Sequence, residues 1–376
     1  MIYLCFIIPL IAVLFLTFVF KAKVIWWERI VIFAAPAVLI IVAKFVSVGM
    51  QTMDQEYLTF YATKATYFEP WDEWVHQTCY RTVCHGAGKS RSCTSVPYDC
   101  SHRVYHPARW ELYDNGGNTY PITQSRYEDL VRTWANSSFQ DLNRHYYHQD
   151  GDAYNTLSDG RFEHVQPICK TEFYENKVQA SKSIFNFQDV SDEEVKSAGL
   201  FRYPITAFDR YDFHPIFGLK DDVASLKLER WNALLGTSKQ VKMLILVFHD
   251  QPYETAMLQE SYWKGGNKNE FILLLSLEKS NSAIQWSKVL SWTENEELKV
   301  RVARRAKEIG PNIPMIVDTM VTDVNKNFVR KNWADFNYLS VEPTGTAVIV
   351  TMVLTLVLTI GLSIFSVMNQ FTEGKH

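Results

Sequence analysis

Three long apolar segments dominate the hydrophobic pattern of the chain, and a long polar stretch separates the second from the third. They run from Ile2 to Phe20, from Trp26 to Val48 and from Ala347 to Phe365. Each is close to the roughly 20 residues that a helix needs to cross the hydrocarbon core of a bilayer. The pattern predicts transmembrane helices at residues 1–20, 26–48 and 345–368, with one large aqueous domain between the last two.

The charge of the first loop predicts how these helices are oriented. Residues 21–29 form a short linker with three basic residues and one acidic residue, and short basic loops stay on the cytoplasmic side. We therefore expect an integral membrane protein with its N-terminus outside, its large domain extracytoplasmic, and a cytoplasmic tail at residues 369–376. The outer compartment is a periplasm, a lumen or the cell exterior. The lipid bilayer is one expected binding partner of the protein.

The first part of the aqueous domain, residues 50–190, has a pattern typical of short strands. Segments rich in Thr, Val and Tyr alternate with turn signals such as Asp114-Asn-Gly-Gly117. They predict a small β-meander over residues 70–122, with Arg103 to Tyr113 as one strand. The capping pattern Ser125-Arg-Tyr-Glu128 then predicts a helix that packs on the meander.

Four of the six cysteines lie close together in this meander, at Cys79, Cys84, Cys93 and Cys100. Paired positions of a hairpin share a nearly constant sum of residue numbers, and this sum differs by only two between the pairs Cys84–Cys93 and Cys79–Cys100. We expect nested disulfides with these pairings, with a bulge or a diagonal pair absorbing the offset. The alternative is a zinc site helped by His85, His102 and His106, although its spacing departs from that of common zinc modules and an oxidising exterior favours disulfides.

The second part, residues 191–340, alternates between helices and strands. A helix is expected from Asp222 to Leu235, ended by Gly236. Its apolar positions are Val223, Leu226, Trp231 and Leu234. The runs Val241–Phe248 and Phe271–Leu277 have the length and composition of strands that are covered on both faces. The remaining elements are expected at residues 252–264, 284–290, 294–308 and 314–330.

This order predicts an α/β layer. The fold class is therefore a membrane protein with three transmembrane helices plus a large α+β extracytoplasmic domain. Within that domain, a disulfide-stapled β-meander precedes an α/β layered subdomain.

Three segments of the α/β layer follow one another in a suggestive order. Leu244-Ile-Leu-Val-Phe248, the helix end Tyr262-Trp-Lys-Gly-Gly266 and the run Asn267-Lys-Asn-Glu-Phe-Ile-Leu-Leu-Leu275 resemble the TPM domain family over about residues 195–340. The family is named for its thylakoid, periplasmic and membrane-bound members. The resemblance implies a strand, a helix, a Gly turn and an apolar strand, then a further strand and two helices, outside a membrane. Where the family has a Gly-rich turn, this chain has Trp286-Ser-Lys-Val-Leu-Ser-Trp292, so no metal site or phosphatase-like activity is assigned to particular residues.

Few residues suggest catalysis or metal binding. His249 and Asp250 end a predicted central strand, where ligands bind in open α/β sheets, although most such pairs merely cap the next helix. Possible metal ligands gather at His145, His148, Asp150 and Asp152. The ligand series of an EF-hand fails at Tyr154, and a solvated loop accounts for this group. We expect neither a bound metal nor a cofactor.

Two polar turns are candidate contact points for a partner. Lys89 and Arg91 lie at the predicted hairpin tip, whose Gly-Ala-Gly-Lys-Ser sequence lacks the first glycine of a phosphate-binding loop. Asn267, Lys268 and Asn269 form the turn before the second apolar strand. A simple solvated surface is the alternative explanation for both turns.

Composition and charge exclude one class of partner. The 38 basic and 41 acidic residues give a net charge of −3, and no basic stripe with interleaved aromatic residues is present, so nucleic acid is not an expected partner. We expect a non-enzymatic, membrane-anchored extracytoplasmic interaction or scaffold protein, which binds a protein partner or self-associates within an envelope or membrane complex. The alternative is an extracytoplasmic hydrolase, phosphatase-like, or a metal-dependent enzyme that uses the α/β layer.

Overall fold

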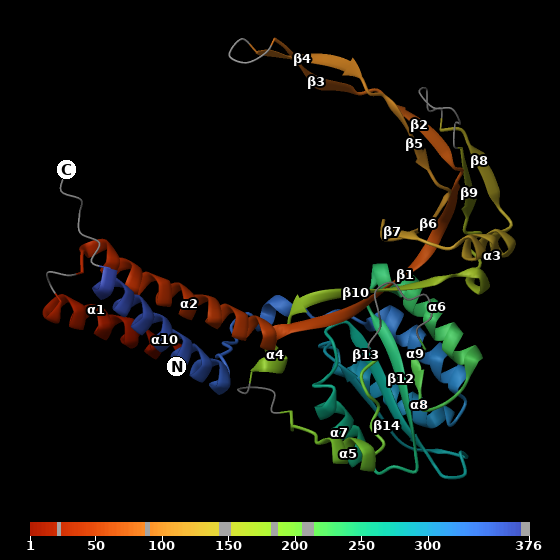
Figure 1. The fold of residues 1–376 in the computed structure, drawn as a ribbon. Coiled ribbons are helices and arrows are strands. Elements are labelled where there is room, and N and C mark those ends of the chain that lie inside the picture. Colours follow the sequence, from red (N-terminus) through yellow and green to blue (C-terminus); the bar gives the residue numbers. More distant parts are fainter. Residues whose placement is uncertain (21–23, 87–90, 143–151, 182–186, 205–213, 370–376) are drawn as a thin grey trace. The chain divides into compact units, whose positions relative to one another are not determined.

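The computed structural model describes residues 1–20, 24–86, 91–142, 152–181, 187–204 and 214–369, and the structural statements below concern these residues (Figure 1). The chain forms two compact units, which we describe one at a time. The first consists of Met1–Glu56, Phe173–Asp189 and Asn332–His376, and the second of Tyr57–Glu172 and Val190–Lys331. Part of the predicted cytoplasmic loop, residues 21–23, and nearly all of the predicted tail, residues 370–376, lie outside the described residues.

Three long helices make up most of the first unit. The first span is a short 3-10 helix, η1 (Ile2–Phe6), that continues into α1 (Ile7–Val19), the second is α2 (Trp26–Thr52), and the third is α10 (Gly345–Asn369). Within the described residues these three helices are long and apolar enough to cross a membrane, at positions close to those that the sequence predicts. The unit also holds two short helices, α4 (Lys177–Ala180) and η4 (Trp333–Phe336).

The three spans pack on one another through two apolar clusters. One cluster joins Ile2 and Cys5 to Ile40 of α2, and the other joins Leu16 of α1 to Ile32 of α2, with partly buried residues of α10 packed against both. Most of the remaining large apolar side chains of the spans are exposed. Such an outward apolar surface is stable when the surrounding solvent is lipid.

A six-stranded sheet forms most of the first half of the second unit, while the first residues of β1 and the last of β10 belong to the first unit. Its strands follow the order β7-β6-β1-β9-β8, and β10 also pairs with β1. In that order they are Thr119–Pro121, Arg109–Asp114, Met53–Phe68, Ala153–Leu157 and Ser137–Gln140, with β10 at Pro167–Glu175. Helix α3 (Gln124–Trp134) buries Tyr127, Leu130 and Trp134 against this sheet, as its sequence predicts. The helix begins two residues earlier than expected, because Thr123 rather than Ser125 caps it.

A four-stranded sheet forms the second half of that unit, in the order β11-β12-β13-β14. The strands are Ile216–Phe217, Lys242–His249, Glu270–Leu277 and Ile284–Ser291. The first three run parallel and β14 runs antiparallel to β13. The helices are α5 (Asp192–Ser197), α6 (Asp222–Ser238), α7 (Glu254–Tyr262), α8 (Glu296–Ile309) and α9 (Ile313–Asn327), and a short helix η3 (Phe162–His164) precedes them.

Both faces of the central strands are covered, which explains their continuous apolar sequence. Alternate residues of β12 and β13, such as Met243 and Leu273, face a core built with α6, α8 and α9. The intervening residues, such as Leu244 and Ile272, face a second core that includes α7 and Tyr57 of β1. The predicted strands and helices of this region are therefore present, within a few residues of the expected bounds.

Helix α6 differs from its prediction. It does not end at Gly236 but continues to Ser238, and it turns Val223 and Leu226 toward solvent. A Cβ added at position 236 would lie 1.7 Å from the carbonyl oxygen of Thr59. The glycine therefore serves a close approach of helix and strand rather than a helix end.

The predicted meander is also corrected. The segment 103–113 is two strands, β5 (His102–His106) and β6, separated at Pro107, because proline removes a ladder donor. Together with β2 (Trp71–Val75), β3 (Thr78–His85) and β4 (Ser92–Asp99), the strands form nested pairs: β1 with β6, β2 with β5, and β3 with β4. The described residues 62–86 and 91–114 thus form the two arms of one long hairpin.

We predict that Gly236→Ala destabilises the second unit by about 1–3 kcal/mol or more, because the new methyl group forces the helix away from the backbone of β1. Thermal unfolding of the purified full chain in detergent measures this. Gly49→Ala in α2 is the matched control, since a Cβ there meets nothing within 4 Å. Equal unfolding temperatures for the two variants would contradict the packing role of Gly236.

Candidate functional site

The outer part of the long hairpin, Trp71–His106, is called the ribbon here. None of its described residues is buried. Its strands pack chiefly against their own ladder partners. Isolated two-stranded hairpins are marginally stable in water, so the ribbon needs support other than a hydrophobic core.

Two disulfides give that support. They join Cys79 to Cys100 and Cys84 to Cys93, the pairs expected from the sequence. Cys84 and Cys93 are direct ladder partners, whereas Cys79 is opposite Tyr98, so the outer disulfide is diagonal and no bulge is needed. With all four sulfurs bonded, the zinc alternative loses its ligands.

Hydrogen bonds also stabilise the segment of the ribbon between its two ladders, β2–β5 and β3–β4. The Cys100 amide donates to the Gln77 carbonyl at 2.9 Å, and the Gln77 amide donates to the Ser101 hydroxyl at 3.1 Å. Ser101 in turn donates to Asp99, and these bonds lower the pKa of the Asp99 carboxyl. At the base, the rings of Trp71 and His106 stack with centroids 3.9 Å apart.

The side chains of the ribbon are those that protein interfaces favour. Tyr80 is 70% exposed and Tyr105 is 63% exposed, and Trp74 and Tyr98 are also exposed. Because Cys79 is opposite Tyr98 and Tyr80 is opposite Pro97, Tyr80 and Tyr98 lie on opposite faces of the ribbon. Tyrosine, tryptophan and arginine are enriched in the energetic centres of protein interfaces.

The predicted contact points have different outcomes. Arg91 is exposed at the tip of the ribbon, and Lys89 lies outside the described residues. The second predicted turn is mostly buried. Asn267 is 5% exposed and Asn269 is 1% exposed, and of the three residues only Lys268 is partly accessible. The prediction of a contact point there is wrong for the two asparagines, because both amides bind groups that are distant in the sequence.

These asparagines belong to a buried polar cluster. The Asn267 amide donates to the Tyr203 hydroxyl at 2.5 Å, and the Asn269 amide donates to the Tyr57 carbonyl at 2.8 Å. Tyr203 donates to the carboxylate of Glu270, whose other oxygen accepts the Asn267 backbone N–H at 2.8 Å. The cluster therefore ties β1 and the segment around residue 203 to the start of β13.

A buried lysine completes the cluster. Lys242 is fully buried, lies opposite Glu270 in the β12–β13 ladder, and places its ammonium 3.1 Å from the Cys169 sulfur and 4.6 Å from the centre of the Tyr57 ring. Burial raises the pKa of Glu270, while the Asn267 and Tyr203 bonds and the charge of Lys242 oppose that rise. Burial, reinforced by the charge of Glu270, also holds the pKa of Tyr203 well above its usual range.

Part of the cluster could have been predicted from the sequence. Lys242 and Glu270 each stand at the start of an apolar strand, and parallel neighbours place their starts side by side. Its distant members, Tyr57 and Tyr203, have no such local signal. Every described contact of the cluster links parts of the fold, and its ionic groups are fully enclosed, so we interpret it as structural.

His249 and Asp250 each contact other residues near the end of β12. His249 Nε2 lies 3.0 Å from the carbonyl oxygen of Gly218, which can only accept, so Nε2 is the donor in this contact. Its Nδ1 faces the side-chain oxygen of Asn281 at 3.2 Å. Asp250 accepts from the Gln285 amide at 3.2 Å, and its backbone adopts the left-handed region, with φ of 51°. Both residues thus shape the end of β12.

Of the predicted metal ligands, His145, His148 and Asp150 lie outside the described residues. Asp152 accepts a long hydrogen bond, 3.4 Å, from the Leu142 amide. Within the described parts of the chain, no group of three or more His, Cys, Asp or Glu side chains is arranged to hold a metal ion.

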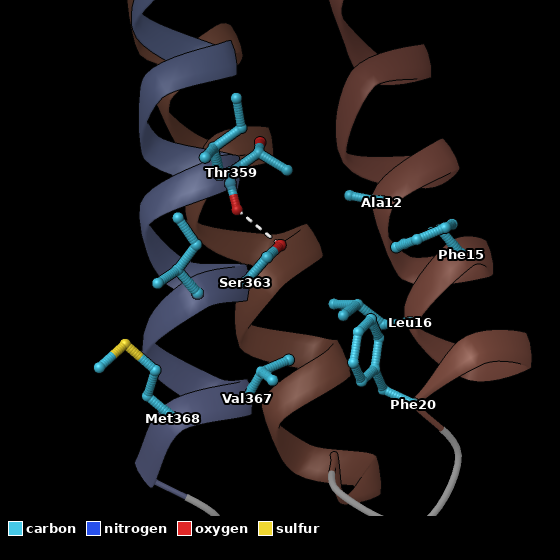
Figure 2. Close-up of a pocket in the computed structure, with 10 residues that line it drawn as sticks. Ala12, Phe15, Leu16, Phe20, Thr359, Ser363, Val367 and Met368 are labelled. Carbon is cyan, nitrogen blue, oxygen red and sulfur yellow. Dashed lines mark hydrogen bonds between the residues drawn. The ribbon is translucent and has the colours of Figure 1, made fainter.

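A groove of about 360 Å³ lies between α1 and α10, and Figure 2 shows the side chains that line it. They are apolar except for Thr359 and Ser363, and the Ser363 hydroxyl donates to the Thr359 carbonyl at 2.7 Å. None of the lining residues is ionisable. The groove is therefore suited to apolar chains.

Comparisons with protein-family models, curated proteins and solved structures gave no match to this chain. The resemblance to the TPM domain family stays a prediction.

We predict that Lys242→Met destabilises the protein by about 3–5 kcal/mol, because the buried Glu270 carboxylate loses its neighbouring cation. Adding Glu270→Gln removes the uncompensated charge, so the double variant should be more stable than Lys242→Met alone. Chemical unfolding of the full chain in detergent measures the three free energies. A double variant as unstable as the sum of the two single variants would show that the charges are not coupled.

The same variants carry a pH signature. Because burial raises the pKa of Glu270 above its ordinary 4.5, the folded state loses stability as the pH rises from below 4.5 through the folded pKa. Glu270→Gln should flatten this part of the stability curve.

Proposed function

We infer that the protein is a membrane-anchored interaction protein whose extracytoplasmic ribbon holds a protein partner. The observation that carries this proposal is the exposure of the whole ribbon. The chain builds a long, disulfide-bonded β-structure with several exposed aromatic rings, and this structure adds nothing to a core of its own. Aromatic rings exposed in this way gain free energy only when another surface covers them.

The disulfides support the proposed location of this domain. Disulfides form and persist in oxidising compartments, and they are rare where glutathione and thioredoxin keep thiols reduced. The orientation expected from the basic first loop leads to the same side of the membrane. The proposed arrangement has the N-terminus outside and the C-terminus in the cytoplasm.

The proposal of a TPM-like region over residues 195–340 rests on element order alone. From β12 to α9 the chain has a strand, a helix, a Gly turn, two strands and two helices, which is the order that the resemblance implies. The alternative function, a hydrolase or metal-dependent enzyme, gains no support from the geometry around His249.

We predict that the ribbon can be shortened without harming the fold. Residues 76–101 would be replaced by Asn-Gly, a two-residue turn between Val75 and His102, which are already ladder partners. Because the removed segment buries no described residue, the unfolding temperature should change by about 2 °C or less. The partner should be lost when the protein is purified from native membranes in mild detergent and its companions are identified by mass spectrometry.

The control for this experiment is Val223→Asp, which changes an exposed residue of α6 in the same unit. This variant should retain the partner. If the shortened protein still carries the same companions in the same amounts, the part of the ribbon beyond Val75 and His102 is not the binding arm. A companion of identical mass would identify self-association.

We also predict that only two of the six cysteines are free thiols. Cys5 and Cys169 should react with a maleimide polymer in the denatured, unreduced protein, and all six should react after reduction. Gel shifts of protein taken directly from membranes count the labels. Cys5→Ser with Cys169→Ser is the control that should remain unlabelled before reduction. Six labels without reductant would contradict both the disulfides and the extracytoplasmic location.

A further inference from the structure

A second surface of the soluble region lies along the open edge of the four-stranded sheet. A groove of about 580 Å³ is bounded by α7, β14 and α8. It is called the β14 groove here. All of its lining residues lie in the second unit, and the ribbon contributes none of them.

The floor of the β14 groove is the edge of a strand. Four consecutive residues of β14, from Trp286 to Val289, line it. Trp286 belongs to the core that includes α7, and Val289 belongs to the core on the side of α8, so their side chains leave the strand on opposite faces. A groove that meets both must follow the backbone between them. In the described part of the chain β14 pairs only with β13, so its outer row of N–H and C=O groups has no ladder partner.

The walls of the groove are basic. Lys288, Lys299, Arg304 and Lys307 line it against two acids, Glu260 and Glu296. Lys288 pairs with Glu260 at 2.5 Å, and Lys299 pairs with Glu296 at 2.5 Å. Both acids are thereby matched, and Arg304 and Lys307 remain as excess positive charge on the exposed side of α8. Arg304 also forms an ion pair at 3.4 Å with the exposed Glu308 of its own helix, which does not line the groove.

This charge decides between two possible occupants of the edge. If β14 of a second copy paired with it, two lysine-rich walls would face each other, and like charges across a ladder are destabilising. An acidic segment would instead be attracted by these basic walls. Extended peptides add to open sheet edges through main-chain hydrogen bonds. The walls beside the edge then contact alternate side chains of the peptide and give specificity.

We propose that the β14 groove binds an extended acidic peptide segment of a protein partner, which adds to the sheet as a strand beside β14. Exposed Tyr253 and Val300 at the rim give apolar contacts to alternate residues of such a segment. This inference does not rest on the ribbon as a binding arm, because the two surfaces share no residue.

The test uses the full chain in nanodiscs and a fluorescein-labelled peptide of alternating Glu and Val residues, followed by fluorescence anisotropy. We expect saturable binding that weakens as salt is raised. A peptide of alternating Lys and Val should not bind. The same Glu-Val peptide with N-methyl groups on alternate amides should bind at least about tenfold more weakly, because it cannot complete the ladder.

The decisive variant reverses the excess charge with Arg304→Glu and Lys307→Glu, two exposed positions that leave the cores untouched. Affinity for the Glu-Val peptide should fall about tenfold or more. Arg132→Glu with Lys196→Glu is the matched control, because it changes the net charge equally at exposed helical positions outside the groove. The control should bind as the natural chain does.

Three results would overturn the proposal: no binding of the Glu-Val peptide, equal binding by the two charge-reversed proteins, or equal binding of the N-methylated peptide. The variant with the shortened ribbon should keep its peptide affinity, so failure of the ribbon proposal and failure of this one are distinguishable.

Discussion

The constraint on which the second unit depends is that β12 and β13 are apolar on both faces. A strand with this composition must be covered twice, and α6, α8 and α9 cover only one side. The other side is completed by α7 together with residues from far earlier in the chain, Tyr57 and Cys169. Burial of the central strands therefore draws β1 and β10 onto the four-stranded sheet.

This dependence explains where polar groups are enclosed. When β1 closes the second face, the starts of β12 and β13 leave solvent, and Lys242 and Glu270 are buried with them. Removing charges from water is expensive, so the cluster has to supply hydrogen bonds and a counter-charge. Tyr203, Asn267 and Asn269 supply the hydrogen bonds. At β14 the covering ends, and the edge of the sheet stays accessible.

Much of this architecture could be predicted from local patterns, and the errors have a common physical origin. Apolar runs, caps and turn residues depend on residues that are close in the chain. The spans, the helices and the cysteine pairs could therefore be predicted from the sequence. The role of Gly236 and the burial of Asn267 depend on contacts with Thr59 and Tyr203, which no local pattern shows. The pairing of β2 with β5 was missed for the same reason, since turn signals alone do not separate a meander from nested strands.

One feature of the connection between the spans and the ribbon bears on mechanics. Helix α2 ends at Thr52 and β1 begins at Met53, with no linker between them. The chain of β1 then leads, through the same long hairpin, to the base of the ribbon. Tension applied at the ribbon tip therefore passes along covalent backbone to the second span, and the disulfides shorten the length of strand that such tension can pull apart.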